Sequence, residues 1–366
     1  MTTPANGHVA TKEALVSVNG VSVPFREGQR VLGALREAGF DVPTLCYESR
    51  LDPQGTCRMC LVEVEVNGQK KTVASCTAFQ QPGMNVATHT QALREYRRTV
   101  LELLLSETAP AAQCPKCHAF GPCQLHAAAQ EYGALADGFP HLRVREKAAD
   151  SNPFIQRDYD YCIACYRCTS VCNQWEMAGA ITVAGSSQSS RIATFFGNEL
   201  LQSPCTFCGQ CINTCPTDAL TDRKLVDRAH AEKLNRTKTI CPYCGVGCGI
   251  QLLSEDGELI GSEPDFDAPS RGSLCVKGQF GSWEFVRSEE RLKYPLIRRN
   301  GVLQRAMWDE AINLVASRFQ ETAAVHGPDS LVFWSSARCT TESNYLMQKL
   351  ARVGLGTNNI DNCSRT

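Results

Sequence analysis

The sequence predicts an α+β protein built from several small domains in series. Three observations lead to this prediction: two β-hairpin patterns near the N-terminus, cysteines grouped in spaced sets, and alternating helix and strand patterns after Glu289. The 366 residues, 43% of them hydrophobic, suffice for two or three domains with their own cores. All but two of the 21 cysteines belong to the spaced sets, so thiolate chemistry dominates the functional interpretation.

Residues 1–90 are predicted to form a small β-grasp ferredoxin-like domain. Two β-rich runs in residues 15–25 are joined by Asn19-Gly20, a pair favoured in type I′ hairpin turns. A short helix that stops at Gly39 follows, and then a cysteine loop leads to a second hairpin, residues 61–66 and 71–76, which turns at Asn67-Gly68. The order strand, strand, helix, cysteine loop, strand, strand is the layout of a β-grasp ferredoxin.

Residues 91–149 are predicted to hold a helix followed by a three-cysteine module. The helix is expected over residues 91–107, with an apolar stripe at helical spacing. The stripe consists of Leu93, Tyr96, Val100, Leu103 and Leu104. Residues 133–156 mix glycine, proline and charge and are expected to be a linker, and the polar residues 221–238 are expected to be a second one.

Residues 297–366 are predicted to begin an α/β domain. Residues 308–319 form an amphipathic helical pattern, residues 330–334 are rich in β-formers, and residues 342–353 suggest another helix.

Charge and hydropathy exclude two classes of partner. The 37 basic and 38 acidic residues give a net charge of −1, so nucleic-acid binding is not expected. Residues 1–15 lack the apolar core of an export signal, and no apolar run reaches the length of a membrane helix. We therefore expect a cytoplasmic protein without membrane partners, in which thiols persist as metal ligands and not as disulfides.

The first cysteine set offers four thiolates in the β-grasp domain, at spacings of ten, two and fifteen residues. Thiolate is the ligand that iron–sulfur clusters require, and Gly55 in the loop lets backbone N–H groups approach the cluster sulfides. The ten-residue first gap is longer than the four residues of plant-type ferredoxins and resembles the [2Fe–2S] domain of the large iron–sulfur subunit of respiratory complex I. The resemblance implies that the [2Fe–2S] ligands are Cys46, Cys57, Cys60 and Cys76.

Residues 150–224 contain one cysteine spacing twice, in residues 162–172 and 205–215. This duplication is typical of a bacterial 2[4Fe–4S] ferredoxin, in which the fourth cysteine of each run binds the cluster of the other run. One predicted cluster is bound by Cys162, Cys165, Cys168 and Cys215. The other is bound by Cys205, Cys208, Cys211 and Cys172.

The three cysteines Cys114, Cys117 and Cys123 predict a further cluster without an obvious fourth ligand. We expect His126 to complete this set, because it can fold back at the start of a following helix. His118, inside the short loop between Cys117 and Cys123, and Glu107 remain alternatives.

Zinc is the main alternative to iron–sulfur clusters. Tetrahedral zinc uses two well-separated cysteine pairs, and Cys114/Cys117 or Cys241/Cys244 would supply one such pair. It fits poorly with four cysteines in the eleven residues 162–172, so clusters are predicted there.

Residues 237–296 carry the last set, Cys241, Cys244, Cys248 and Cys275, followed by Val276-Lys277-Gly278. Glycines between these cysteines permit the tight backbone that a [4Fe–4S] cluster needs. This motif resembles the N-terminal cluster domain of molybdopterin oxidoreductases. The resemblance implies that Lys277 lies between the cluster and the pterin and relays electrons.

The N-terminal modules are also similar to the large iron–sulfur subunit of respiratory complex I. In that family a histidine lies four residues before the first cysteine of the three-cysteine set, whereas this chain has Pro110 there.

Residues 335–352 and 356–366 resemble the alpha subunit of cytoplasmic NAD-dependent formate dehydrogenases, and the similarity extends over essentially the whole chain. The resemblance implies that the next residue after Thr366 would be the selenocysteine or cysteine that binds molybdenum or tungsten. A selenocysteine codon read as a stop is the simplest hypothesis for that boundary. Cys363 is expected to be a buried free cysteine, and the 366-residue chain alone is expected to be inactive with formate.

The resemblance implies interconversion of formate and carbon dioxide at a bis-molybdopterin guanine dinucleotide centre. The expected cofactors in this chain are one [2Fe–2S] and three to four [4Fe–4S] clusters. Because a G-x-G-x-x-G fingerprint is missing, NAD and flavin are expected on a separate iron–sulfur partner subunit. The alternatives are a stand-alone iron–sulfur electron-transfer protein and a subunit of complex I or hydrogenase type.

Overall fold

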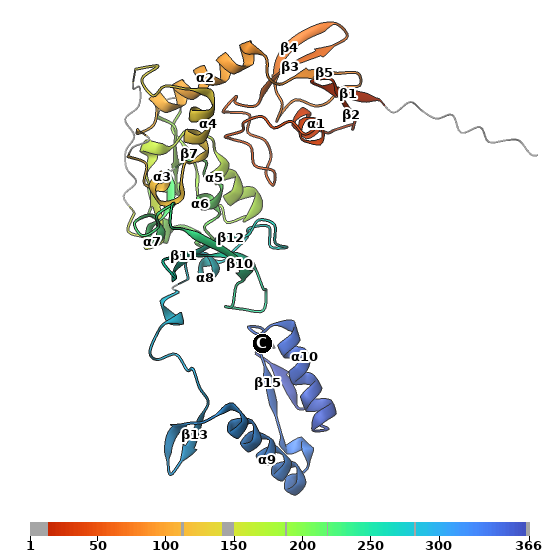
Figure 1. Ribbon diagram of the computed structural model, residues 1–366, viewed down its shortest axis with the longest axis vertical. Helices are drawn as coiled ribbons and strands as arrows, with labels where there is room; N and C mark the ends of the chain where they lie inside the picture. The colour runs from red at the N-terminus through yellow and green to blue at the C-terminus, as the bar shows by residue number, and fades with distance from the viewer. Residues whose placement is uncertain are drawn as a thin grey trace, which may run out of the picture. The chain divides into compact units, whose positions relative to one another are not determined.

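The computed structural model describes residues 14–110, 113–140, 150–186, 189–217, 219–281 and 283–363 (Figure 1). The chain divides into two compact units, Met1–Leu234 and Asn235–Thr366. Among the helices in these ranges, none is both long and apolar enough to cross a membrane.

The first domain is a five-stranded sheet with strand order β2-β1-β5-β3-β4. Both predicted hairpins are present, and Asn19 and Gly20 have φ angles of 47° and 87°, as a type I′ turn requires. The prediction missed the short β5, which pairs in parallel with β1 and joins the two hairpins. Val16, Val62 and Val86 from the sheet pack against Leu35 of α1 in one core. The elements are β1 (Leu15–Val18), β2 (Val21–Pro24), α1 (Val31–Glu37), β3 (Leu61–Val66), β4 (Gln69–Ala74) and β5 (Asn85–Ala87).

Helix α2 (Gln91–Ser106) lies where it was predicted, but its buried face differs from the predicted stripe. Tyr96 and Leu103 are exposed, whereas Arg97 is only 1% exposed. The Arg97 guanidinium donates hydrogen bonds to the carbonyl oxygens of Met59 and Leu61, at 3.2 and 2.8 Å. These bonds offset the cost of burying the Arg97 charge. Apolar periodicity alone does not predict that an arginine is buried.

Two short helices follow, α3 (Pro115–Phe120) and α4 (Gln124–Tyr132), and α2 packs along α4 (Figure 1). Cys114 precedes α3 and Cys123 precedes α4, so each helix begins directly after a cysteine of the three-cysteine set.

The ferredoxin region combines two cysteine runs with two small antiparallel strand pairs. Each run turns into a short helix, and the cysteines lie in the loops and short helical turns of these runs. The elements are β6 (Ile155–Arg157), α5 (Arg167–Ser170), β7 (Thr182–Ala184), β8 (Arg191–Ala193), α6 (Gln210–Thr214), β9 (Leu220–Asp222) and α7 (Arg223–Val226).

The second predicted linker is largely wrong, and the first is wrong only near its C-terminal end. In the first, residues 141–149 lie outside the described part and residues 133–140 form no helix or strand, but β6 begins at Ile155. Asp150 also forms a 2.7 Å buried ion pair with Arg157. The segment 221–238 contains the end of β9, all of α7 and the start of β10. Buried Leu225 and Val226 anchor α7, so the polar composition describes only its outer face.

The second unit begins with a three-stranded antiparallel sheet, β10-β11-β12, followed by helix α8. A hairpin of β13 and β14 leads to α9. Strands β15 and β16 pair in parallel with α10 between them, which confirms the predicted start of an α/β domain. The elements are β10 (Asn235–Ile240), β11 (Gly249–Glu255), β12 (Glu258–Pro264), α8 (Val276–Phe280), β13 (Leu296–Arg299), β14 (Val302–Arg305), α9 (Trp308–His326), β15 (Phe333–Ser335), α10 (Thr341–Lys349) and β16 (Ile360–Asn362).

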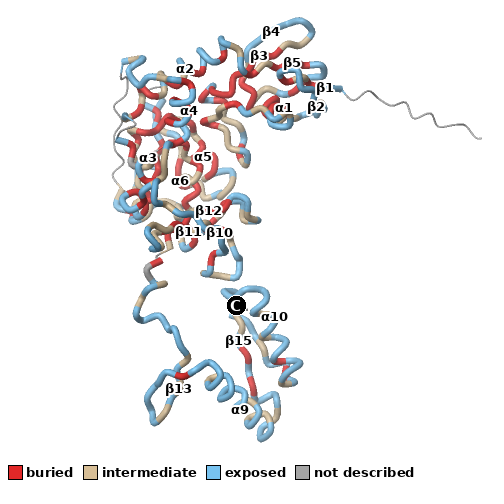
Figure 2. Tube along the Cα trace, in the orientation of Figure 1, coloured by how far each residue is buried: buried red, intermediate tan, exposed pale blue. Residues whose placement is uncertain are grey.

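Helix α9 has no buried residue among those described, and Trp308 is 65% exposed (Figure 2). The core of this α/β segment is small and is formed by Leu331, Phe333 and Ala351 with Phe319 against them.

Candidate metal centres

The four cysteines of the first set come together in the β-grasp domain, and all four are buried. The backbone N–H of Cys46 donates to Cys57 Sγ at 3.4 Å, and that of Cys57 donates to Cys46 Sγ at 3.5 Å. Thiol hydrogen bonds from Cys57 and Cys76 hold the pKa of Cys46 well below its usual value. A hydrogen bond from Cys76 lowers the pKa of Cys60 to about 6. Four gathered thiols with backbone donors around them fit a [2Fe–2S] cluster.

Gly55 has a structural role in this loop. Its φ of 64° is a left-handed conformation, and a Cβ there would lie 2.9 Å from Thr77 Cγ2. The loop can therefore close over the cysteines only with glycine at this position.

In the ferredoxin region the cysteines separate into two groups that exchange their fourth members. Cys162, Cys165, Cys168 and Cys215 line one cavity of about 20 Å³. Cys172, Cys205, Cys208 and Cys211 line another, of about 30 Å³. These are the two ligand groups expected from the bacterial ferredoxin pattern.

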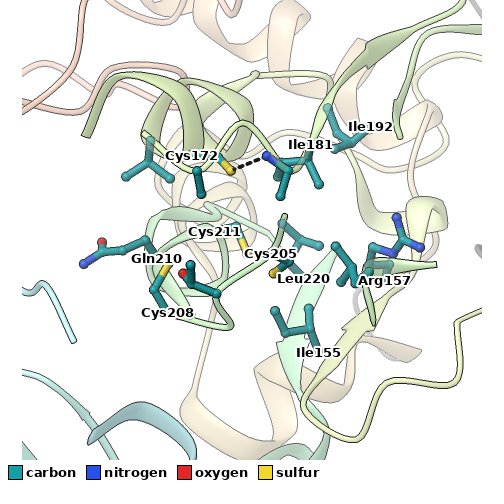
Figure 3. A pocket seen from close by; sticks show the side chains of 16 residues that line it. Ile155, Arg157, Cys172, Ile181, Ile192, Cys205, Cys208, Gln210, Cys211 and Leu220 are labelled. Atoms are coloured by element: carbon teal, nitrogen blue, oxygen red, sulfur yellow. Dashed lines mark hydrogen bonds between the residues drawn. The ribbon is translucent and has the colours of Figure 1, made fainter. Parts of the chain in front are cut away.

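Figure 3 shows the second of these cavities. The sulfurs of Cys172, Cys205, Cys208 and Cys211 converge from two cysteine runs, and Ile155, Ile181, Ile192 and Leu220 form apolar walls. The backbone N–H of Ala180 donates to Cys172 Sγ at 3.4 Å. An apolar wall with a backbone donor to a ligand sulfur fits a [4Fe–4S] cluster.

Burial raises the pKa of the thiols around both cavities. The pKa of Cys168 and Cys211 lies well above its usual value, because these thiols are buried and other cysteines lie beside them. Burial also raises the pKa of Cys205 to about 11. A bound cation is what stabilises thiolates in such surroundings, so the donor set is suited to metal and not to free thiolate chemistry.

The structure also brings together Cys114, Cys117, Cys123 and His126. Cys117 Sγ lies 3.0 Å from His126 Nδ1, and Cys123 Sγ lies 3.3 Å from the same atom. Hydrogen bonds with Cys117 and then Cys123 raise the pKa of His126 to about 10. His126 is buried in the first turn of α4, whereas His118 is exposed on α3. Of the two histidines, only His126 is placed to act as a ligand.

The last set lies in the second unit. Cys241 is buried, and its backbone N–H donates to the carbonyl oxygen of Cys248 at 2.8 Å. Burial, and then the neighbouring Cys241, Cys244 and Cys275, raises the pKa of Cys248, so the four thiols are close to one another. Lys277 is exposed on α8, two residues after Cys275.

This cysteine loop contacts the segment 336–339 of the α/β region. The backbone N–H of Gly245 donates to the carbonyl oxygen of Ala337 at 2.8 Å. A Cβ at Gly245 would lie 2.5 Å from that oxygen and 2.6 Å from the carbonyl oxygen of Cys339, so only glycine permits the contact. The same segment meets Cys363, whose Sγ accepts a hydrogen bond from the backbone N–H of Ala337 at 3.4 Å.

Cys363 is exposed, so the expectation that it would be buried is wrong. It follows β16 at the edge of a two-stranded sheet, where the described residues provide little cover. Thr366 lies outside the described residues.

Sequence patterns missed Arg167, which lies between cysteines of the ferredoxin run and is 5% exposed. Its guanidinium donates to the carbonyl oxygens of Thr44 and Thr214 at 3.4 and 3.3 Å and to Gln124 Oε1 at 3.0 Å. Each of these three residues is within two positions of a cysteine from a different set or run. An arginine inside a cysteine motif is the sequence signal that would have identified it.

Comparison with family models supports the division into cluster-binding regions. Residues 12–91 match the 2Fe-2S iron–sulfur cluster binding domain, and residues 161–219 match the 4Fe-4S dicluster domain. Residues 234–287 match the molybdopterin oxidoreductase Fe4S4 domain, and residues 291–366 match the molybdopterin oxidoreductase family. These matches confirm the predicted fold class.

Among curated proteins, the chain is 33% identical to "Probable oxidoreductase YjgC" of Bacillus subtilis, over 96% of this chain and 39% of that protein. It is 30% identical to "Putative formate dehydrogenase SAR2393" of Staphylococcus aureus, with the same coverage. It is 32% identical to the "NADPH-Fe(3+) oxidoreductase subunit alpha" of Geobacter sulfurreducens, over 96% of this chain and 40% of that protein. The chain thus spans about two fifths of the length of these relatives.

Among solved structures, the chain is similar to one from an NAD+-reducing [NiFe]-hydrogenase in the H2-reduced state. The two are 31% identical with a TM-score of 0.51, and the match covers 58% of this chain and 88% of the other.

Proposed function

Because this chain is an iron–sulfur chain of the molybdopterin oxidoreductase family, we propose that it is the electron-transfer part of a formate dehydrogenase alpha subunit. In this role it passes electrons between a molybdenum or tungsten centre, where formate and carbon dioxide interconvert, and a partner that reduces NAD. Its oxidoreductase character rests on the cluster-binding domains and the molybdopterin oxidoreductase match.

The observation that carries this proposal is the contact between the Cys241 loop and the α/β region. The 2.8 Å hydrogen bond from Gly245 to Ala337 joins a cysteine loop to the segment that resembles formate dehydrogenase alpha subunits. The fit of glycine against two carbonyl oxygens leaves no space for a side chain between them. A short and rigid contact of this kind suits electron transfer, because it fixes the distance between the Cys241 loop and the α/β region.

A bis-molybdopterin guanine dinucleotide with molybdenum or tungsten would supply the two-electron chemistry of formate. Lys277, two residues after Cys275, would lie between that cofactor and the Cys241 site and stabilise negative charge there. The Cys241, Cys244, Cys248 and Cys275 thiolates would hold one [4Fe–4S] cluster. The ferredoxin cysteines and the β-grasp cysteines would hold the clusters that lead to the partner.

We place NAD and flavin on a separate iron–sulfur subunit. The names of two relatives, an NADPH-Fe(3+) oxidoreductase subunit and an NAD+-reducing hydrogenase, support a nicotinamide-linked assembly. No disulfide joins the cysteines in the part of the chain that the structure describes, which suits the reducing cytoplasm.

Metal analysis and formate-dependent dye reduction test this proposal together. Purified holoenzyme is expected to contain molybdenum or tungsten and to reduce a dye when formate is added. Lys277→Ala is expected to slow formate-dependent dye reduction, while Lys293→Ala, another exposed lysine of the same unit, serves as the matched control. A holoenzyme with full iron content that lacks both metals and does not respond to formate would refute the proposal.

The second candidate is an electron-transfer subunit of complex I or hydrogenase type, without a formate site. The match to the NAD+-reducing hydrogenase favours it, because this chain covers 88% of that structure. The match to the molybdopterin oxidoreductase Fe4S4 domain over residues 234–287 favours the first candidate. The absence of molybdenum and tungsten from active holoenzyme would support the second.

A further inference from the structure

The four donors Cys114, Cys117, Cys123 and His126 form an unusually tight group. Cys114 Sγ lies 3.0 Å from Cys117 Sγ, and His126 Nδ1 lies 3.0 and 3.3 Å from Cys117 and Cys123 Sγ. All four donor atoms lie within 4.8 Å of one another. Among the described residues, this is the one group of three or more potential ligands that gathers so closely.

The ferredoxin cysteines are arranged differently. They stand around two cavities with apolar walls, so there is space between the sulfurs. Beside the tight group, a cavity of about 340 Å³ is lined by His126, Thr108 and Ala129 but by none of the three cysteines. The free space thus lies outside the ring of thiols and not within it.

Donor spacing distinguishes a single ion from a cluster. Zinc has Zn–S and Zn–N distances of about 2.3 and 2.0–2.1 Å, so tetrahedral donors lie roughly 3.6–3.8 Å apart. A [4Fe–4S] cluster holds each ligand on its own iron and spreads the four ligands much further. The observed separations of 3.0 and 3.3 Å are thus nearer to the spacing of ligands around one ion than to their spacing around a [4Fe–4S] cluster.

We propose that Cys114, Cys117, Cys123 and His126 bind a single tetrahedral zinc ion in place of the cluster expected from the sequence. Three thiolates and one imidazole are a common structural zinc set, and four protein donors leave no position open for a substrate. Cys114, Cys123 and His126 are buried, in keeping with a closed site.

His126 Nε2 supports ligation through Nδ1. It is buried and has no hydrogen-bond partner among the described atoms, and His126 lines the 340 Å³ cavity. A metal-bound histidine usually donates its second N–H to a carbonyl, a carboxylate or a water, and that cavity has space for a water.

The ion would hold α3 and α4 against the ferredoxin region. Lys116 Nζ donates to the carbonyl oxygens of Cys215 and Thr217, each at 3.3 Å, and the Leu125 N–H donates to the Pro216 carbonyl oxygen at 3.3 Å. The turn with Cys215, a predicted cluster ligand, is thus held by the two helices that the zinc would join. The role of the zinc ion would therefore be structural.

A redox-inactive ion here does not interrupt the electron path. Cys46, Cys57 and Cys165 share one packed core with Cys123. Arg167, next to Cys168, also donates directly to the carbonyl oxygens of Thr44 and Tyr47 beside Cys46, so the β-grasp loop and the first ferredoxin run meet without the Cys114 module.

Zinc and iron contents of the purified protein test the proposal without any use of formate, so its failure is separable from that of the proposed function. We expect about one zinc that resists chelator washing, with about 14 irons from one [2Fe–2S] and three [4Fe–4S] clusters. Absorption at the zinc edge is expected to show three sulfurs near 2.3 Å and one nitrogen near 2.0 Å, as typical zinc sites do. About 18 irons with negligible zinc would overturn the proposal.

Three variants sharpen the assignment. His126→Ala is expected to lose the zinc and keep all iron, whereas His126→Cys is expected to keep the zinc in a four-sulfur site. His118→Ala, in the same module but exposed, is the matched control and is expected to change neither metal. Loss of about four irons in His126→Ala with no change in zinc would contradict the proposal, and the wild-type zinc-edge spectrum decides the matter if the variants fail to fold.

Discussion

The guanidinium of Arg167 donates a hydrogen bond to the carbonyl oxygen of Thr214, 3.3 Å away. Arg167 precedes Cys168 in the first ferredoxin run, and Thr214 precedes Cys215 at the end of the second. Arg167 also donates to Tyr47, directly after Cys46 of the β-grasp set. One buried cation thus fixes two cysteine runs and a separate cysteine loop relative to one another.

Replacing Arg167 with glutamine should lower the reduction potential of the clusters beside it, because a buried positive charge stabilises the reduced form. For charges roughly 10 Å apart at an effective dielectric of about 20, the effect is on the order of 1.7 kcal/mol, or about 70 mV. Redox titration followed by EPR measures the shift.

Arg167→Lys is the matched variant for this experiment, since it keeps the charge and loses the planar fork of donors. Arg167→Lys should keep the reduction potential of these clusters close to the wild-type value, but it should lower the free energy of unfolding. Equal potentials in the wild type and in Arg167→Gln would show that the arginine has only a packing role.

In the proposed arrangement, the fourth cysteine of each ferredoxin run binds the cluster of the other run. Pairs of serine variants test this arrangement. Cys215→Ser should change the same EPR signal as Cys162→Ser, because both residues line the first cavity. Cys172→Ser should change the signal that Cys205→Ser changes. If Cys215→Ser instead alters the Cys205 signal, each run binds its own cluster and the assignment is incorrect.

Gly245→Ala should uncouple the Cys241 site from the α/β region, because the new methyl group would meet two carbonyl oxygens at 2.5 and 2.6 Å. We expect formate-dependent dye reduction to fall at least about tenfold, which corresponds to roughly 1.4 kcal/mol of lost transition-state stabilisation, while iron content is kept. The measurement is the rate per bound iron.

Gly257→Ala is the control for this variant, since Gly257 also lies in the second unit and has open space around its Cα, although its φ is +80°. Gly257→Ala should lower the free energy of unfolding and leave the rate of formate-dependent dye reduction per bound iron unchanged. Similar losses of rate in both variants would mean that general destabilisation, and not the contact with Ala337, causes the effect.

Stability should depend on pH through Asp222, whose pKa is raised to about 6 by burial. The folded state favours the protonated carboxyl of Asp222. Its contribution to the free energy of unfolding is therefore fully present below about pH 4 and is lost as the pH rises through 6. Asp222→Asn should remove the decrease in stability between pH 5 and pH 7.5. Thermal unfolding of the wild type and the variant at these two pH values measures it. An unchanged pH dependence in the variant would contradict the assignment to Asp222.

Local signals were sufficient to predict much of the fold. Asn19-Gly20 and Asn67-Gly68 predicted both hairpins, because type I′ turns need positive φ at two adjacent positions. Cysteine spacing identified the groups that the structure brings together around the two ferredoxin cavities.

Features set by distant contacts were not accessible in the same way. The pairing of β5 with β1 joins residues that are far apart in sequence, and the burial of Arg97 depends on carbonyl groups some 36 residues away. The polar composition of residues 221–238 predicts a linker, because charged residues surround the buried Leu225 and Val226 in the sequence. The close grouping of His126 with three thiols shows only when α3 and α4 are folded.

We propose that this chain carries electrons from a formate-oxidising centre through the Cys241 site. Anaerobic holoenzyme mixed with formate and frozen after increasing times provides the most direct test, with EPR used to follow each cluster. The account predicts that the signal removed by Cys241→Ser appears first, before the signals of the ferredoxin and β-grasp sites, and that Lys277→Ala delays it. Clusters that stay oxidised with formate but become reduced by NADH through the partner would contradict the account.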